Sequence, residues 1–193
     1  MTYRFSQREL AQAQAQKDIF AELAATAQWP EEVQQRLQPL LGPAWFVYLL
    51  MGIASREDKF GLALSDDPAT LDINEKGTPG GVGDYGHGRG EMQIDDRWHP
   101  AFVATGAWKD LATSIYYGLV QVLQPNYVLL SRHFELFDHD YLNLILGMVA
   151  SYNCGAGGVL AALRGGGDVD ARTTGRDYSA DVWDRAEQLA QIV

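Results

Sequence analysis

The stretch "GPAWFVYLLMGIASRE", residues 42–57, decides how the rest of the chain folds. It contains the longest apolar run of the sequence, 43–54, which is about a dozen residues long, whereas a membrane span needs roughly 20. An apolar run of this length is typical of a buried core helix. We therefore expect a buried helix that starts after Gly42-Pro43 and ends near Arg56, and we expect no membrane span.

Helical patterns continue on both sides of this stretch. Ser6 and Glu9 have the Ser-x-x-Glu spacing of a capping box, which predicts a helix from there to Trp29-Pro30. A second helix is expected over 30–41. Because short alternating runs are nearly absent, the predicted fold class is mainly α, with at most a small sheet. Beyond residue 100, the pattern predicts helices over 107–124, 127–137, 138–153 and 177–193.

Composition fits one folded domain. A chain of 193 residues buries about 70 % of the surface that its extended form exposes, and 47 % hydrophobic content excludes a disordered chain. No repeat, linker or second core is visible, so we predict a single domain over 1–193. Its first two helices occupy 1–42, and the core that carries the functional site occupies 43–193.

The charge balance argues against one class of partner. Lys and Arg number 15 and Asp and Glu number 25, so a net charge of −10 leaves no basic excess to neutralise the phosphates of a nucleic acid. The single cysteine, Cys154, cannot form a disulfide within the chain. The opening residues "MTYRFSQREL" contain no apolar signal-peptide core, so no signal peptide is visible in this chain.

Residues 61–90 lose all periodicity and are rich in glycine and proline. We expect a loop or a short hairpin here, and an irregular segment of this length is usually functional or disordered. It runs into "GDYGHGRGEMQIDDRWHP", residues 83–100, which gathers carboxylates on a glycine-rich backbone. Such a backbone can approach a ligand closely because glycine has no Cβ.

Glu57 ends the apolar helix, where the helix dipole and an apolar wall both disfavour its charged form. A glutamate in that position can hold a proton near neutral pH, as a general acid must. Cleavage of a glycosidic bond by inversion also needs a second carboxylate, roughly 6.5–9.5 Å away, which activates a water. Asp84 and Asp95 follow far enough along the chain to fold back over the helix end.

Four motifs occur in order along the chain: Ser-Arg-Glu at 55–57, Gly-x-Gly-Asp at 81–84, Gly-x-Met-Gln-x-Asp at 90–95 and Tyr-Asn-x-Gly-Ala-Gly at 152–157. Together they resemble the goose-type lysozymes, within the superfamily of lysozymes and soluble lytic transglycosylases. The tail "TTGRDYSADVWDRA" is also similar to the closing helix of that family, so the resemblance covers about 43–190. It implies a mainly α fold of the α+β lysozyme-like kind, in which a glycine-rich loop or small β-hairpin lines a cleft.

By position, the resemblance implies that Glu57 is the general acid and that Asp84 and Asp95 hold the nucleophilic water. It places five further residues along the sugar cleft: Gln93, His99, Tyr152, Asn153 and Tyr178. Structural roles stay open for four of them, since the Tyr-Asn pair could support the Gly-Ala-Gly turn, the glutamine could satisfy buried backbone groups and the histidine could be a packing residue. The resemblance implies no cofactor and no metal, and the histidines lack zinc-like spacing.

The chain departs from the family pattern at three positions. Glu91 stands where leucine is usual, and this extra carboxylate is expected either to be exposed by a local shift or to lie near the cleft, where it would perturb the titration of Glu57. Asp58 stands where serine is frequent. Cys154 replaces alanine and is expected to be a buried, inert thiol.

Three functions are open from the sequence. The first is a peptidoglycan N-acetylmuramidase of the inverting kind, which hydrolyses the β-1,4 bond between N-acetylmuramic acid and N-acetylglucosamine. The two matched aspartates favour it. The second is a lytic transglycosylase that forms 1,6-anhydro ends, and the third is a catalytically impaired glycan-binding module.

The resemblance also implies where such a protein acts. Its partner would be the glycan strands of bacterial peptidoglycan, with a protein lysozyme inhibitor as a second candidate, and its site of action would be outside the cell, at the cell wall or in the periplasm. The acidic balance is unusual for this role, because many wall polymers are anionic and repel a chain of net charge −10 unless salt screens the repulsion.

Overall fold

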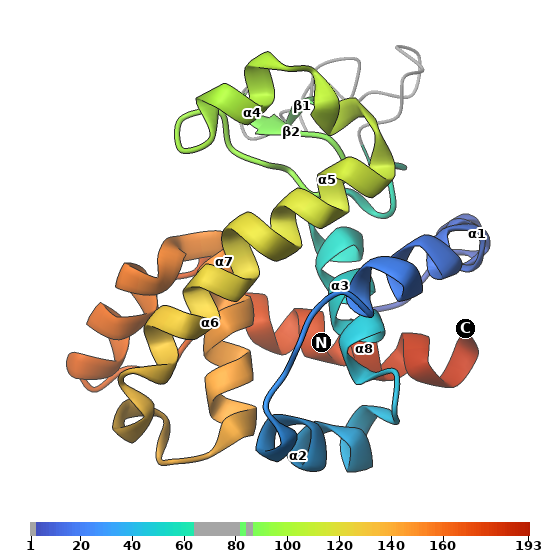
Figure 1. Cartoon of the computed structure of the whole chain (residues 1–193). Helices are drawn as coiled ribbons and strands as arrows, with labels where there is room; N and C mark the ends of the chain where they lie inside the picture. Colours follow the sequence, from blue (N-terminus) through green and yellow to red (C-terminus); the bar gives the residue numbers. More distant parts are fainter. Residues whose placement is uncertain (1–2, 64–81, 84–86) are drawn as a thin grey trace.

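Helices form most of the computed structural model, which describes residues 3–63, 82–83 and 87–193 (Figure 1). The α-helices are α1 (Gln7–Ala24), α2 (Glu31–Leu41), α3 (Trp45–Asp58), α4 (Pro100–Ala104), α5 (Leu111–Tyr117), α6 (Gln124–Ser131), α7 (Tyr141–Arg164) and α8 (Tyr178–Ile192). From α4 onward, the helices are connected by the 3-10 turns η3 (Ala107–Lys109), η5 (Phe134–Phe137) and η6 (Thr174–Arg176) and by the π-helical segment η4 (Gly118–Leu123).

The sheet is a single small hairpin among the described residues. Its strands β1 (Val82–Gly83) and β2 (Gly88–Arg89) are antiparallel, with Val82 opposite Arg89 and Gly83 opposite Gly88. The hairpin and α4 gather at one end of the molecule, and α2 lies at the other end (Figure 1). The prediction of a mainly α fold with a small hairpin is confirmed.

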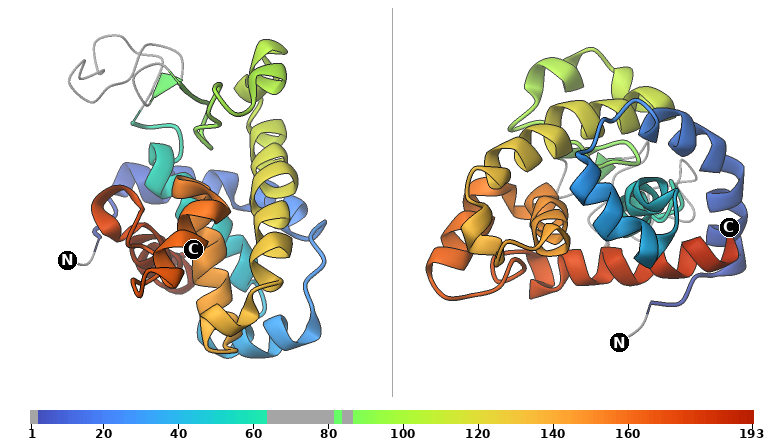
Figure 2. Two further views of the ribbon diagram at one scale, coloured as in Figure 1. Left: turned by 90° about the vertical axis from the view of Figure 1, so that its left-hand side faces the viewer. Right: turned by 60° about the horizontal axis from the view of Figure 1, so that its bottom comes forward.

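The apolar stretch at residues 42–57 forms most of α3, and most of the residues of this helix are buried. Figure 2, in its right-hand view, shows α3 almost end-on in the middle of the helical part. It packs most extensively against α8 and also contacts α1 and α2. Gly52 permits the close approach of α8, because a Cβ at this position would lie 2.7 Å from the backbone oxygen of Val182.

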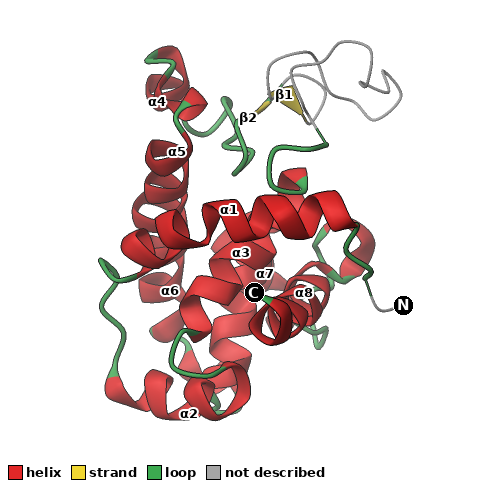
Figure 3. Ribbon diagram, turned by 90° about the vertical axis from the view of Figure 1, so that its right-hand side faces the viewer, coloured by secondary structure: helices red, strands yellow, loops and turns green. Residues whose placement is uncertain are grey.

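The N-terminal helix begins as its sequence predicts. Ser6 Oγ accepts a hydrogen bond from the Glu9 amide at 3.2 Å, and Glu9 Oε2 accepts one from the Ser6 amide at 2.8 Å, which completes the capping box of α1. Figure 3 shows α1 crossing in front of α3. The second helix also follows the prediction, since α2 starts directly after Pro30.

The predicted boundary near residue 125 is wrong, because α5, η4 and α6 run on as one rod (Figure 1). Pro125 lies in the first turn of α6, directly after the π-helical segment, where a residue without an N–H is tolerated. The helix predicted over 127–137 ends at Ser131, and the rest of that range contains the 3-10 turn Phe134–Phe137.

The helix predicted over 138–153 begins at Tyr141, and its helical path breaks at Gly155, close to the predicted end. Gly155 produces this break, because its φ of 72° and ψ of 154° are not helical and are values that other residues rarely adopt. A second helical segment of α7 follows this break and ends at Arg164, directly before three consecutive glycines. By length and hydropathy α7 could cross a membrane, and α2 with α3, bent by 70°, pass the same test as a pair. Since 56 % of the apolar window of α7 is buried inside the molecule, this is the pattern of a core helix.

Candidate active site

Glu57 lies in the last turn of α3, half-buried, where the start of α8 meets it. The hydroxyl of Tyr178, the first residue of α8, donates a hydrogen bond to Glu57 Oε1. Burial raises the pKa of Tyr178 well above its usual value, and the charge of Glu57 and this hydrogen bond raise it further. The phenol therefore stays protonated and remains a donor to the carboxylate.

A network of ion pairs fixes this junction of α3 and α8. Arg56 binds Asp181 at 2.7 Å and Asp177 at 3.1 Å. Arg185, only 5 % exposed, binds the same oxygen of Asp181 at 2.8 Å and donates to the Ser55 hydroxyl at 2.8 Å. Because Arg56 and Arg185 each bond across the α3–α8 junction, the end of α3 cannot move without breaking several of these bonds at once.

A groove of about 520 Å³ adjoins this junction. Its walls come from residues 93–99, the η4–α6 rod and the kinked part of α7. The structure brings five of the predicted site residues together in this lining, whereas Glu57 and Tyr178 lie at the α3–α8 junction. The five are Gln93, Asp95, His99, Tyr152 and Asn153.

Tyr152 connects the groove with Glu57. It lines the groove, and burial followed by the charge of Glu57 raises its pKa well above the usual value. Its hydroxyl donates to the Met92 carbonyl at 2.7 Å, which ties α7 to the turn after the hairpin. Gly118 leaves the space for it, since a Cβ there would lie 3.1 Å from the Tyr152 hydroxyl oxygen.

Gln93 and Asn153 line the groove, and the side chain of each also makes a hydrogen bond with a backbone group. Gln93 has φ 47°, and its Nε2 donates to the Gly90 carbonyl at 2.7 Å. Gly88 leaves room for the Gln93 side chain in this position, because a Cβ there would lie 2.2 Å from Gln93 Oε1 and would force that side chain to move. Asn153 Oδ1 accepts a hydrogen bond from the Thr174 amide at 2.8 Å, so the residue ties α7 to the segment before α8.

Asp95 is engaged by Arg97. Its Oδ1 accepts a hydrogen bond from the Arg97 amide at 2.8 Å, and its Oδ2 pairs with the Arg97 guanidinium at 2.5 Å. Burial raises the pKa of Asp95, but the hydrogen bonds and charge of Arg97 outweigh burial and hold the pKa below its usual value. Asp95 is therefore a carboxylate at neutral pH.

The neighbouring Asp96 is held by two further basic groups. Arg89 pairs with it at 2.8 Å and His87 Nδ1 lies 2.8 Å from it. Ligand atoms of His87, Asp95 and Asp96 lie within 4.8 Å of one another, a spacing that a cation could use. A cation there would compete with the guanidinium groups already bound to both carboxylates, so the donor set does not favour a metal.

His99 lines the groove and also packs against Tyr117. Its Nδ1 lies 3.0 Å from the Tyr117 hydroxyl, and its ring meets the Tyr117 ring edge to face at 5.3 Å. Tyr117 in turn stacks on Phe102 at 3.7 Å. Burial lowers the pKa of His99, although the charge of Asp95 opposes this effect.

Glu91 corrects the expectation for this residue, since it is neither exposed nor part of the groove lining. It is half-buried, and its carboxylate contacts α1, where Gln16 Nε2 donates to its Oε2 at 2.9 Å and its Oε1 is buried. Burial raises the pKa of Glu91 to about 7, and the bond from Gln16 opposes this only in part.

Two other expectations need comment. Cys154 is half-buried and lines the groove, so the prediction of a buried thiol is wrong, although burial does raise its pKa and keeps the thiol protonated. Asp84, the third predicted catalytic residue, lies outside the described residues.

The supporting residues were missed from the sequence. Arg56 stands inside the Ser-Arg-Glu motif, but the motif did not indicate its ion pairs with α8, and Tyr117 belongs to none of the four motifs. Asp181 and Arg185 are spaced i, i+4 on a helix, which favours an ion pair and was available as a hint.

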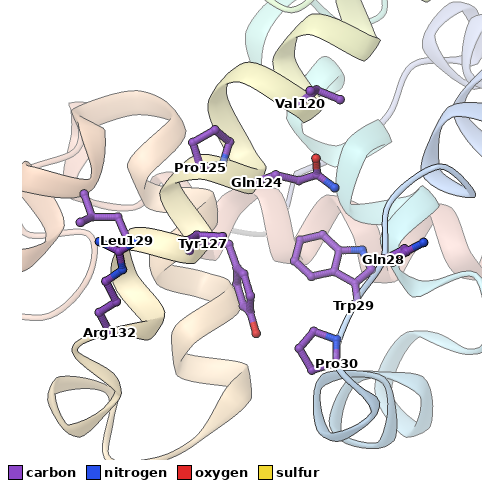
Figure 4. Close-up of a pocket in the computed structure, with 10 residues that line it drawn as sticks. Gln28, Trp29, Pro30, Val120, Gln124, Pro125, Tyr127, Leu129 and Arg132 are labelled. Atoms are coloured by element: carbon purple, nitrogen blue, oxygen red, sulfur yellow. The ribbon is translucent and has the colours of Figure 1, made fainter.

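A second cavity, of about 680 Å³, lies away from this site between residues 28–30 and the η4–α6 rod (Figure 4). Trp29 and Tyr127 both line it and meet edge to face, with their ring centroids 5.1 Å apart, and Gln124 lies above them in the view of Figure 4. Among the described residues that line it, none carries a carboxyl group, so it offers no general acid.

No family model matches the chain. Three curated relatives share 148 aligned residues with it, which is 74 % of this chain: lysozyme g of Casuarius casuarius at 29 % identity, lysozyme G of Dromaius novaehollandiae at 28 % and lysozyme g of Gallus gallus at 30 %. The aligned region makes up 64 %, 58 % and 56 % of these relatives, so the chain spans less than two thirds of their length.

Proposed function

Because the chain is related to the goose-type lysozymes over these 148 residues, we propose that it is an inverting muramidase that hydrolyses the β-1,4 bond between N-acetylmuramic acid and N-acetylglucosamine in bacterial peptidoglycan. The observation that carries the proposal is the position of Glu57. Its carboxyl is fixed by Tyr178 beside a groove that holds five other residues of the resemblance. The protein would act outside the cell or at the wall, where this substrate is found.

In the proposed reaction, protonated Glu57 gives its proton to the leaving glycosidic oxygen and becomes a carboxylate. Tyr178 donates to that carboxylate, so the product of the proton transfer is stabilised by a bond already in place. The ion pairs of Arg56 and Arg185 hold the helix end, and hence the carboxyl, in a fixed position.

Asp95 would hold the attacking water, together with Asp84. Its lowered pKa supports this role, because only the ionised form can accept a proton from water. A water on the face of the sugar opposite Glu57 would give inversion at the anomeric carbon.

One observation favours a second candidate. Both oxygens of Asp95 are engaged by Arg97, which lowers the capacity of this carboxylate to act as a base. A lytic transglycosylase needs no water-holding carboxylate, because the 6-hydroxyl of the muramic acid residue itself attacks the anomeric carbon. The second candidate is therefore the formation of 1,6-anhydro ends at the same site.

Analysis of the sugar ends separates these candidates. Purified peptidoglycan is digested, the new ends are identified by mass spectrometry, and fresh products are examined by proton NMR before mutarotation. Reducing N-acetylmuramic acid with inverted configuration is the expected result. Predominant 1,6-anhydro ends would establish the transglycosylase, retained configuration would exclude inversion, and intact strands after prolonged incubation would leave only glycan binding.

A further inference from the structure

Trp98 is the most exposed large hydrophobic residue of the described chain, with 79 % of its surface accessible. The chain has five tryptophans, and the other four are buried or half-buried. Trp98 also belongs to the lining of the 520 Å³ groove. An indole left in water at the edge of a groove keeps an apolar face available for a ligand.

The backbone that carries Trp98 is fixed on both sides. The amides of Trp98 and His99 both donate to the Asp95 carbonyl, at 3.2 Å and 2.9 Å. Pro100 then begins α4, which restricts the chain after the turn. A ligand that stacks on the indole therefore has little backbone entropy to remove.

The surroundings of Trp98 favour a polar ligand that has one apolar face. The charged Arg97 and Asp95 line the same groove, and none of the other exposed large hydrophobic residues of the described chain belongs to this lining. The described surroundings of the indole are therefore mixed in polarity, unlike the apolar patches that dock other proteins. The groove wall supplied by α6 and α7 carries the amides of Asn126 and Asn153. A pyranose ring matches this set, since it presents C–H groups on one face and hydroxyl or acetamido groups at its edge.

We propose that Trp98 is a positioning residue that stacks on an N-acetylhexosamine ring of the glycan at the rim of the groove, away from the bond that is cleaved. This inference rests on the proposed function, because it assumes a β-1,4-linked amino-sugar chain as the ligand. Trp98 contributes to holding the strand, while Glu57 acts on the scissile bond.

Binding of a defined oligosaccharide tests the stacking. The probe is the β-1,4-linked tetramer of N-acetylglucosamine, titrated by calorimetry into the parental protein and into Trp98→Ala, Trp98→Phe and Tyr116→Ala. The alanine variant should bind about tenfold more weakly, and the phenylalanine variant should fall in between, because a smaller ring keeps part of the stacking surface. Tyr116 is a matched control, because it is 47 % exposed but lies outside the groove lining, and its variant should bind as the parental protein does.

Fluorescence gives a readout that a purely structural role would not change. Only the exposed indole should be quenched strongly by acrylamide, a neutral probe chosen because the chain carries a net charge of −10. The oligosaccharide should protect the parental protein from quenching and give no such protection in Trp98→Phe. On peptidoglycan, Trp98→Ala should raise KM and leave kcat within about twofold, as expected for uniform binding.

The outcomes separate this inference from the proposed function. Equal affinity for the oligosaccharide in the parental protein and Trp98→Ala overturns the stacking, even where peptidoglycan is cleaved. If Trp98→Ala binds the tetramer more weakly, and the parental protein binds it but never cleaves peptidoglycan, the stacking is supported and the muramidase is overturned. A parental protein that neither binds the tetramer nor cleaves the wall overturns both.

Discussion

Glu57 and Glu91 are both half-buried, but their side chains have different hydrogen-bond partners. Glu57 receives a hydroxyl hydrogen bond from Tyr178 beside the groove. Glu91 receives one amide bond from Gln16, and its Oε1 is buried with no hydrogen-bond partner. The oxygen of the same Gln16 amide is also buried and without a partner. An ionised Glu91 offers only acceptors, so it cannot satisfy that amide oxygen, whereas a protonated Glu91 carries a donor.

This comparison shows that a raised pKa alone does not locate a catalytic acid. The pKa of Glu91 is raised to about 7, the range that suits a general acid, yet the residue contacts α1 and does not line the groove. Glu57, in contrast, accepts a hydrogen bond from Tyr178 and lies beside the groove. Burial by itself produces the pKa shift, and access to a ligand has to be established separately.

The substitution Glu57→Gln is expected to have the largest effect, and it tests whether Glu57 or Glu91 is the general acid. The amide is nearly isosteric but cannot give a proton to the leaving oxygen, so lysis of cell walls should fall by about 10²–10⁴-fold with the fold intact. Turbidity clearance of a peptidoglycan suspension and circular dichroism give the two readouts. Glu91→Gln is the matched control and should keep most of the lytic activity and the same pH optimum.

A folded Glu57→Gln protein that lysed walls at more than about a tenth of the parental rate would remove Glu57 from the role of general acid. Loss of activity in Glu91→Gln, with Glu57→Gln active, would exchange the roles of the two glutamates.

Glu91 should dominate a pH dependence of stability. Its pKa is about 7 in the folded state against an ordinary value of 4.5, so the folded protein binds a proton that the unfolded chain releases. The contribution is fully present below pH 4.5 and is lost as the pH rises through 7. At about 1.4 kcal/mol per pKa unit, the free energy of unfolding should fall by about 3 kcal/mol across this window on account of this residue.

Urea denaturation at a series of pH values measures this effect as the difference between the parental protein and Glu91→Gln. The difference should change sharply between pH 4.5 and 7, because the glutamine has no proton to lose. Parallel stability curves over that window would show that Glu91 is solvated in solution.

The packing that places Glu57 can be tested at Gly52. A Cβ there would lie 2.7 Å from the Val182 carbonyl, so Gly52→Ala should push α3 from α8 and destabilise the protein by about 1–3 kcal/mol. Gly157→Ala on α7 is the control, because a Cβ there meets nothing within 4 Å and alanine should stabilise the helix by about 0.5–1 kcal/mol. Thermal unfolding of both variants gives the comparison, and equal midpoints would show that the α3–α8 contact is looser than described.

The smallest expected effect comes from removing the Tyr178 hydroxyl, which tests whether its hydrogen bond to Glu57 contributes to the lytic rate. Tyr178→Phe removes one hydroxyl from a buried ring, and loss of a hydrogen bond to a charged group should lower the lytic rate by about tenfold. Tyr48→Phe is a suitable control, since its ring lies beside Lys17 on another face of α3. Steady-state rates that match the parental protein would show that Tyr178 serves packing alone.

The sequence by itself determined the central helix, its capping-box neighbour and the scarcity of strand, because apolar periodicity and helix-start residues act over a few neighbouring positions. The motif order also identified five residues that the structure brings to one groove. The catalytic roles of Glu57, Asp84 and Asp95 and the single-domain organisation stay predictions.

Tertiary structure decided what depends on contacts between distant segments. The rod through Pro125 follows from a π-helical segment that no local pattern predicts, and a second helical segment continues α7 beyond the kink at Gly155. The side chain of Glu91 turns toward α1, where Gln16, far away in the sequence, donates a hydrogen bond to it. Local sequence fixes the backbone of an element, but the direction in which a polar side chain finds its partner is set by the elements packed around it.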